Sequence, residues 1–131
     1  MPLSRCHILI VEDDRVIALE LKQAVEAANG QAVGPAHTLA QGLAIIRAEK
    51  IHGALLDANL PDGDVSPIAE ELIGRGIPVV IQTGIASPLQ LKQRHPDLPV
   101  FVKPVPASRL VRAVAGLMPL DPDAPVKQAV L

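Results

Sequence analysis

Aromatic side chains are almost absent from this chain. Its 131 residues include no Trp, no Tyr and a single Phe, Phe101. The core is therefore expected to be aliphatic, and functions that need stacked aromatic rings are excluded.

The sequence also has little cysteine, no excess of basic residues and no long hydrophobic run. Cys6 is the only cysteine, which excludes an internal disulfide and fits a reducing cytoplasm. A net charge of −2 and a pI near 6.0 argue against binding to nucleic acid or to an anionic membrane. Apolar runs such as Ile8–Val11 are far shorter than the roughly 18 residues of a membrane span. We therefore expect a cytoplasmic protein with no nucleic-acid or membrane partner.

The length and the 49% share of hydrophobic residues predict one globular domain. We place this domain at residues 1–118. Residues 119–131 are rich in proline and are expected to form a loose C-terminal tail.

Short apolar runs alternate with segments of helical periodicity along the domain. The runs expected to form strands are Ile8–Val11, Gln31–Ala36, Ala54–Leu56, Pro78–Ile81 and Val100–Val102. A helical segment follows each run, and the fourth is short because Pro96 and Pro99 close it. Five such units predict an α/β fold, a doubly wound parallel sheet of five strands with helices on both faces.

Polar residues follow four of the predicted strands. They are Glu12-Asp13-Asp14, Asp57, Thr83 and Lys103. In such folds ligands bind at the carboxyl ends of the strands, so these side chains are expected to meet. Clustered carboxylates repel one another unless a cation joins them, and Mg²⁺ prefers oxygen ligands. An aspartate beside a metal ion, a lysine and a hydroxyl is equipped to accept a phosphoryl group.

With these residues in place, the sequence resembles the response-regulator receiver domain, the CheY-like family. The matching stretches are Ile8–Asp14, Leu55–Gly63, Thr83-Gly84 and Val102–Pro104. The resemblance implies the flavodoxin-like strand order 2-1-3-4-5. Ile81–Ala86 is also similar to the "FATGUY" variant of the receiver, although the Phe and Tyr of that motif are missing.

The resemblance implies a role for each matching residue. Asp57 would be phosphorylated, and it would share Mg²⁺ with Asp13, with Glu12 acting through water and with the backbone carbonyl of Asn59. Asp14 receives no role beyond its charge.

The same resemblance implies roles in phosphoryl binding and hydrolysis. Thr83 would bond a phosphoryl oxygen, and Lys103 would pair with the phosphoryl group, positioned by a cis bond to Pro104. Asn59 and Ile85 would tune how fast the acyl phosphate hydrolyses.

The switch region, Thr83, Val100 and Phe101, departs from the family pattern. Many members carry Tyr or Phe where this chain has Val100. Phe101 lies one place along, and the alternation of a strand points it to the opposite face. The usual coupling between threonine and an aromatic ring is therefore not expected here.

These observations favour a single-domain response regulator. Such a protein is not expected to be an enzyme, because it catalyses only its own phosphorylation and dephosphorylation. Its partners would be a sensor histidine kinase or a histidine phosphotransfer protein, and a downstream protein target reached by switching or by phosphate relay. It would be a monomer or a weak homodimer.

The alternative is a receiver-fold binding module that works without phosphorylation, which Val100 and the short fourth helix favour. An aspartate phosphatase fits poorly because Asp57-Ala58-Asn59 lacks a second aspartate, and a flavin-binding protein fits worse without aromatic residues.

Overall fold

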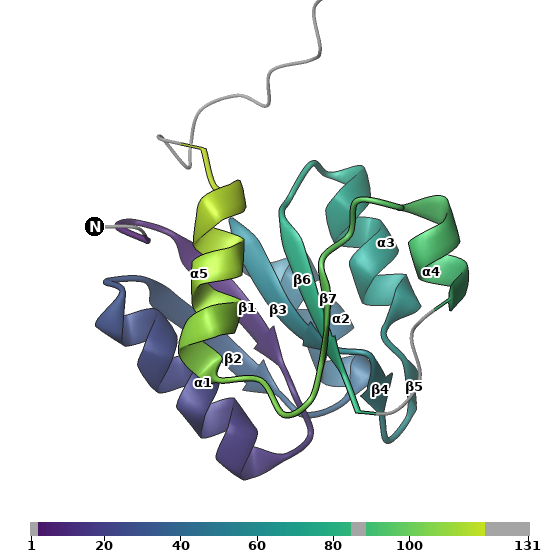
Figure 1. Ribbon diagram of the computed structural model, residues 1–131, viewed down its shortest axis with the longest axis horizontal. Helices are drawn as coiled ribbons and strands as arrows, with labels where there is room; N and C mark the ends of the chain where they lie inside the picture. The colour runs from purple at the N-terminus through teal and green to yellow at the C-terminus, as the bar shows by residue number, and fades with distance from the viewer. Residues whose placement is uncertain (1–2, 85–88, 120–131) are drawn as a thin grey trace, which may run out of the picture.

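A five-stranded parallel sheet forms the centre of the protein (Figure 1). The computed structural model describes residues 3–84 and 89–119. The sheet order is β2-β1-β3-β6-β7, with every neighbouring pair parallel. Its strands are β1 His7–Val11, β2 Gln31–Ala36, β3 Gly53–Asp57, β6 Val79–Thr83 and β7 Val100–Val102. Because β4 and β5 form a separate hairpin, this is the predicted order 2-1-3-4-5, and the doubly wound fold is confirmed.

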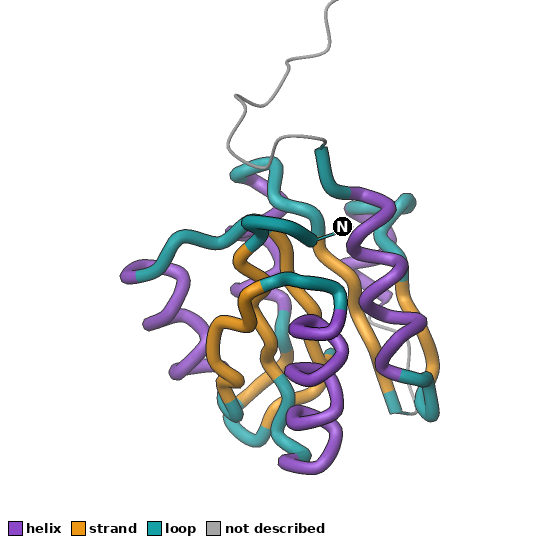
Figure 2. Tube along the Cα trace, turned by 90° about the vertical axis from the view of Figure 1, so that its left-hand side faces the viewer, coloured by secondary structure: helices purple, strands orange, loops and turns teal. Residues whose placement is uncertain are grey.

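A helix follows each strand of the sheet, as Figure 2 shows along the chain trace. The helices are α1 Arg15–Ala27, α2 Leu39–Ala48, α3 Ser66–Gly74, α4 Leu89–Arg94 and α5 Ala107–Leu117. With six residues, α4 is the shortest, as its flanking prolines predict. Within the described residues no helix has the length and apolar character needed to cross a membrane.

Two aliphatic clusters pack on opposite faces of the sheet. One joins the sheet to α1 and α5 through side chains such as Leu21 and Leu110. The other joins it to α2, α3 and α4 through side chains such as Ile46, Ile68 and Leu91. All five residues of β3 are buried, which explains why Ala54–Leu56, before Asp57, is a continuous apolar run rather than an alternating one.

A short hairpin follows β3 and is fastened to a helix distant in sequence. Its strands are β4 Asn59–Leu60 and β5 Gly63–Asp64. The Asp62 carboxylate accepts hydrogen bonds from the backbone N–H groups of Leu39 (2.7 Å) and Ala40 (3.0 Å) at the start of α2. These two bonds hold the pKa of Asp62 below its ordinary value, and they anchor the segment that follows Asp57.

The predicted boundary between domain and tail falls at the edge of the described part of the chain. Helix α5 ends at Leu117, before the predicted boundary at residue 118. Residues 120–131 lie outside the described residues, so the loose tail stays a prediction.

Two leucines of α1 offer a matched test of this packing. Leu21 is 0% exposed and Leu19 is 52% exposed. We expect Leu21→Ala to lower the free energy of unfolding by about 2–5 kcal/mol, because the substitution leaves a cavity in the core. Leu19→Ala should change it by less than about 0.5 kcal/mol. Urea denaturation measures both, and equal losses would contradict the assignment of this helix face to the core.

Candidate functional site

The carboxyl ends of four strands bring the predicted site residues to one edge of the sheet (Figure 1, lower edge). Glu12 follows β1, Asp57 ends β3, Thr83 ends β6 and Lys103 follows β7. Glu12, Asp57 and Thr83 are almost fully buried, with 0%, 4% and 1% of their surface exposed. Charged and hydroxyl side chains buried at one place need partners there.

The Lys103 ammonium lies between the two buried carboxylates. Its Nζ is 3.1 Å from Glu12 Oε1 and 3.3 Å from Asp57 Oδ2. Burial lowers the pKa of Lys103, but the hydrogen bonds and charges of Glu12 and Asp57 outweigh burial and raise it overall. The lysine therefore stays charged and offsets part of the repulsion between the two acids.

The Glu12 carboxylate has two further donors. The side-chain amide of Gln82 donates to Oε1 (2.8 Å), and the backbone N–H of Asp14 donates to Oε2 (3.1 Å). Desolvation by burial is the main reason that the pKa of Glu12 rises to about 8, and its hydrogen bond with Asp57 adds to the rise. Without a metal ion, Glu12 thus keeps its proton at neutral pH.

Glu12, Asp13 and Asp57 form an acidic cluster that could hold a metal ion. One carboxylate oxygen from each lies within 4.8 Å of the others. Asp13 is exposed, and although burial raises its pKa, hydrogen bonds with Asp57 and Glu12 lower it overall. Three carboxylates at this spacing offer only hard oxygen ligands, which suit Mg²⁺ or Ca²⁺ better than a soft metal.

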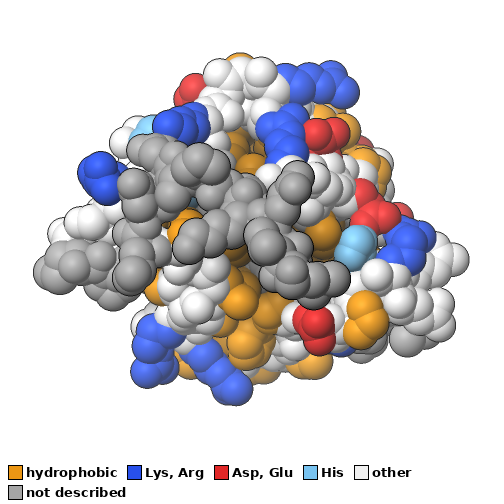
Figure 3. All heavy atoms as spheres, turned by 90° about the horizontal axis from the view of Figure 1, so that it is seen from above, with side chains coloured by type: hydrophobic (Ala, Val, Ile, Leu, Met, Phe, Trp, Pro, Cys, Tyr) orange, Lys and Arg blue, Asp and Glu red, His pale blue; other side chains and the backbone are white. Residues whose placement is uncertain are grey.

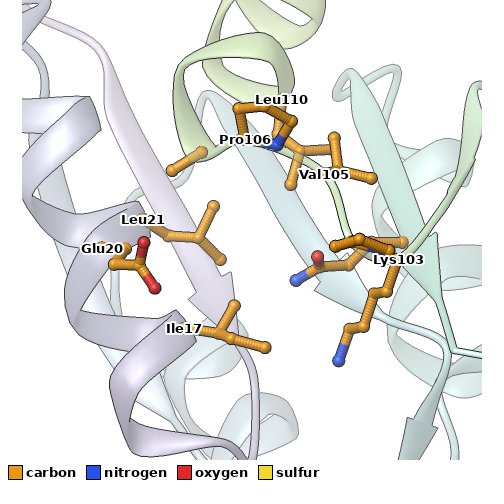
Figure 4. A pocket seen from close by; sticks show the side chains of 10 residues that line it. Ile17, Glu20, Leu21, Lys103, Val105, Pro106 and Leu110 are labelled. Carbon is orange, nitrogen blue, oxygen red and sulfur yellow. The ribbon is translucent and has the colours of Figure 1, made fainter.

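A groove runs beside this cluster, between α1 and the segment from Lys103 to Leu110 (Figure 4). Its volume is about 690 Å³. Ile17 and Leu21 line one side, and Lys103 enters from the other with its ammonium turned toward the strand ends. The Lys103–Pro104 peptide bond is cis, as the resemblance implied. Gln82 and Lys103, which both contact Glu12, are the site residues that line this groove.

The opposite end of the molecule has a different character. Figure 3 looks at this end, and there the visible Lys and Arg side chains are interspersed with Asp and Glu and with hydrophobic side chains.

Comparisons with known proteins agree with the geometry. No protein-family model matches the chain, and no curated protein matches it either. Among solved structures, SdrG from Sphingomonas melonis Fr1 has 37% sequence identity and a TM-score of 0.71 over 89% of this chain and 98% of its own. A response regulator receiver domain protein (CheY-like) from Methanospirillum hungatei JF-1 has 30% identity and a TM-score of 0.76 over 86% and 93%. The chain belongs to the CheY-like receiver family.

The predicted switch residues on β7 point to opposite faces of the sheet, as the alternation of a strand predicts. Val100 packs against the cluster of α2, α3 and α4, whereas Phe101 packs on the face of α1 and α5. The Arg109 guanidinium lies 5.2 Å from the centre of the Phe101 ring, within the range of a cation–π contact. The single aromatic ring is thus engaged on the face away from Val100. Ile85, the second predicted tuning position, lies outside the described residues.

Sequence reasoning missed three residues that shape the receiver site. Asp14, which was given no role beyond charge, caps α1 by accepting from the N–H groups of Val16 (2.9 Å) and Ile17 (3.1 Å). His37 Nδ1 lies 2.9 Å from the carbonyl oxygen of Glu12. Gln82 was unmarked, although a polar residue inside the run Val79–Thr83 was a usable signal.

The raised pKa of Glu12 makes the stability of the metal-free receiver depend on pH. The folded protein keeps a proton on this group up to about pH 8, and the unfolded chain releases it near the ordinary value of 4.5. This contribution to stability is fully present below about pH 4.5 and is lost as the pH rises through about 8.

We therefore expect the free energy of unfolding to fall between pH 5 and pH 8 in buffer with a chelator. Glu12→Gln removes the titrating group and should give a flatter profile. Urea denaturation at several pH values measures both, and a wild-type slope no steeper than that of the variant would contradict the assignment.

Proposed function

We propose that this receiver accepts a phosphoryl group on Asp57 from a phosphohistidine of a sensor histidine kinase or histidine phosphotransfer protein. The observation that carries this proposal is the contact between the buried Asp57 carboxylate and the Lys103 ammonium, inside the acidic cluster. A related structure, SdrG from Pseudomonas melonis Fr1, is described in a BeF3-activated conformation, with 38% identity over 87% of this chain and 97% of its own and a TM-score of 0.66.

The chemistry is a transfer of one phosphoryl group. An oxygen of the Asp57 carboxylate attacks phosphorus, a P–O bond forms, and the P–N bond to the donor imidazole breaks. The imidazole nitrogen keeps the electron pair of that bond and takes a proton from water. Hydrolysis of the acyl phosphate later returns Asp57 and releases inorganic phosphate.

The chain's own residues lower the barrier by charge and position. Lys103, already beside Asp57, pairs with the negative charge of the incoming phosphoryl oxygens. Thr83 ends β6, the strand next to β3, and its hydroxyl donates a hydrogen bond to one of these oxygens. By the resemblance, Asn59 and Ile85 would tune how fast the acyl phosphate hydrolyses.

Magnesium is the cofactor that fits the acidic cluster. Asp13 and Asp57 would hold it directly and Glu12 through water, since carboxylate oxygens of these three residues lie within 4.8 Å of one another. The resemblance adds the carbonyl oxygen of Asn59 as a further ligand. The ion would supply positive charge that neutralises the transferring phosphoryl group.

The signal then passes to a downstream protein by contact, in the cytoplasm, with the receiver as a monomer or weak homodimer. A receiver-fold module that binds its partner without phosphorylation is the second candidate. The observation that favours it is the pair Val100 and Phe101, because the aromatic ring lies on the face opposite the position that carries Tyr or Phe in many members.

The proposal predicts one phosphoryl group on one residue. Wild-type protein incubated with a small phosphodonor and Mg²⁺ should gain the mass of a single phosphoryl group. Asp57→Asn should gain none, whereas Asp97→Asn, an exposed aspartate away from the site, should behave like wild type. Intact-mass spectrometry measures all three. An unmodified wild type, under conditions that modify a control receiver, would favour the phosphorylation-independent module.

Magnesium binding should stabilise the folded receiver. At a Mg²⁺ concentration about 100 times its dissociation constant, we expect a gain of about 2.7 kcal/mol in the free energy of unfolding, because only the folded state holds the complete cluster. Asp13→Asn should lose most of this gain and Asp97→Asn should keep it. Thermal denaturation with and without Mg²⁺ tests this, and equal gains in all three proteins would refute the assigned ligands.

A further inference from the structure

Gln82 is a polar side chain buried within a strand of aliphatic residues. It precedes Thr83 in β6, where Val79, Val80 and Ile81 are all buried and apolar. Only 3% of Gln82 is exposed. Burying an amide costs free energy unless the amide is hydrogen-bonded, so its partner shows what this position does.

The partner is the most buried acid of the site. Gln82 Nε2 donates to Glu12 Oε1 at 2.8 Å, and Glu12 is 0% exposed. In the sheet, Gln82 is in register with Asp57 on β3. The amide thus reaches from β6 to the end of β1, across the strand that carries the phosphorylation site.

Gln82 and Lys103 donate to the same oxygen. Lys103 Nζ lies 3.1 Å from Glu12 Oε1 and also 3.3 Å from Asp57 Oδ2, so the lysine is divided between two carboxylates. A phosphoryl group on Asp57 adds roughly one to two units of negative charge and draws the ammonium toward it. Any such movement weakens the bond from Lys103 to Glu12.

We propose that Gln82 is a positioning residue that keeps Glu12 hydrogen-bonded when Lys103 turns to a phosphoryl group on Asp57. The inference rests on the proposed function, because it assigns Gln82 a role only in the phosphorylated state. A buried carboxylate that loses a donor is costly. With the Gln82 amide in place, Oε1 keeps one donor while the lysine moves. Without the Gln82 amide, Oε1 of Glu12 depends on Lys103 as its donor, and Lys103 is then less available to bind the phosphoryl group on Asp57.

The inference separates two binding events. Before phosphorylation Lys103 still donates to Glu12, so replacing Gln82 should change the affinity for Mg²⁺ alone only slightly. Beryllofluoride, a mimic of the phosphoryl group, requires the lysine at Asp57, so the same replacement should lower the affinity for beryllofluoride more strongly. A purely structural role for Gln82 would weaken both events equally or would change only the stability of the fold.

The test compares wild type with Gln82→Met, which keeps the length of the side chain and removes the donor. Affinities for Mg²⁺ alone, and for beryllofluoride at saturating Mg²⁺, are measured from amide chemical shifts in NMR titrations. We expect Gln82→Met to bind beryllofluoride at least about tenfold more weakly, the size expected for a lost hydrogen bond to a charged group. Its Mg²⁺ affinity should change less than about threefold.

The controls make each outcome decisive. Gln31→Met repeats the exchange at an exposed position of β2 and should match wild type in both titrations. If Gln82→Met does not fold, Gln82→Leu takes its place. Unchanged beryllofluoride affinity, or equal losses of both affinities, overturns the role of Gln82 while the proposed function stands. A wild type that binds no beryllofluoride overturns the proposed function and this inference together.

Discussion

The site depends on one charged group shared between two acids. Lys103 reaches the buried carboxylates of Glu12 and Asp57 from the end of β7. Those carboxylates follow β1 and end β3, and the lysine offsets part of the repulsion between two acids buried at one place. The fold provides the strand order that places these three ends together, and the aliphatic clusters on both faces hold the strands rigidly.

Both buried acids of the site have hydrogen-bond donors other than Lys103. Two donors besides Lys103 serve Glu12, namely Gln82 and the backbone of Asp14. Asp57 receives, in addition to the lysine, a bond from the backbone N–H of Asn59 at 3.3 Å. Each acid therefore has a donor besides the lysine, and the Lys103 ammonium is the donor that the two acids share.

The sequence alone was sufficient to predict the strand ends. Carboxyl ends of parallel strands meet at one edge, so the positions of Asp57, Thr83 and Lys103 after apolar runs predicted their proximity. The contacts of Asp62 with the start of α2 could not be predicted, because they join residues more than 20 positions apart and a turn signal does not show what its side chains will contact. The polar Gln82 inside an apolar run was visible in the sequence, but its partner was not, because Glu12 lies across the sheet from it. Asp14 was assigned only charge because a run of three acids hides which one caps the helix.

The most direct test of this account is a crystal structure of the protein with Mg²⁺ and beryllofluoride. The account predicts beryllium bonded to an Asp57 carboxylate oxygen, Lys103 Nζ closer to a fluorine than to Glu12, and the Gln82 amide still on Glu12 Oε1. Beryllofluoride absent from Asp57 under conditions that load a control receiver, or a lysine that stays on Glu12 in the loaded site, would contradict it.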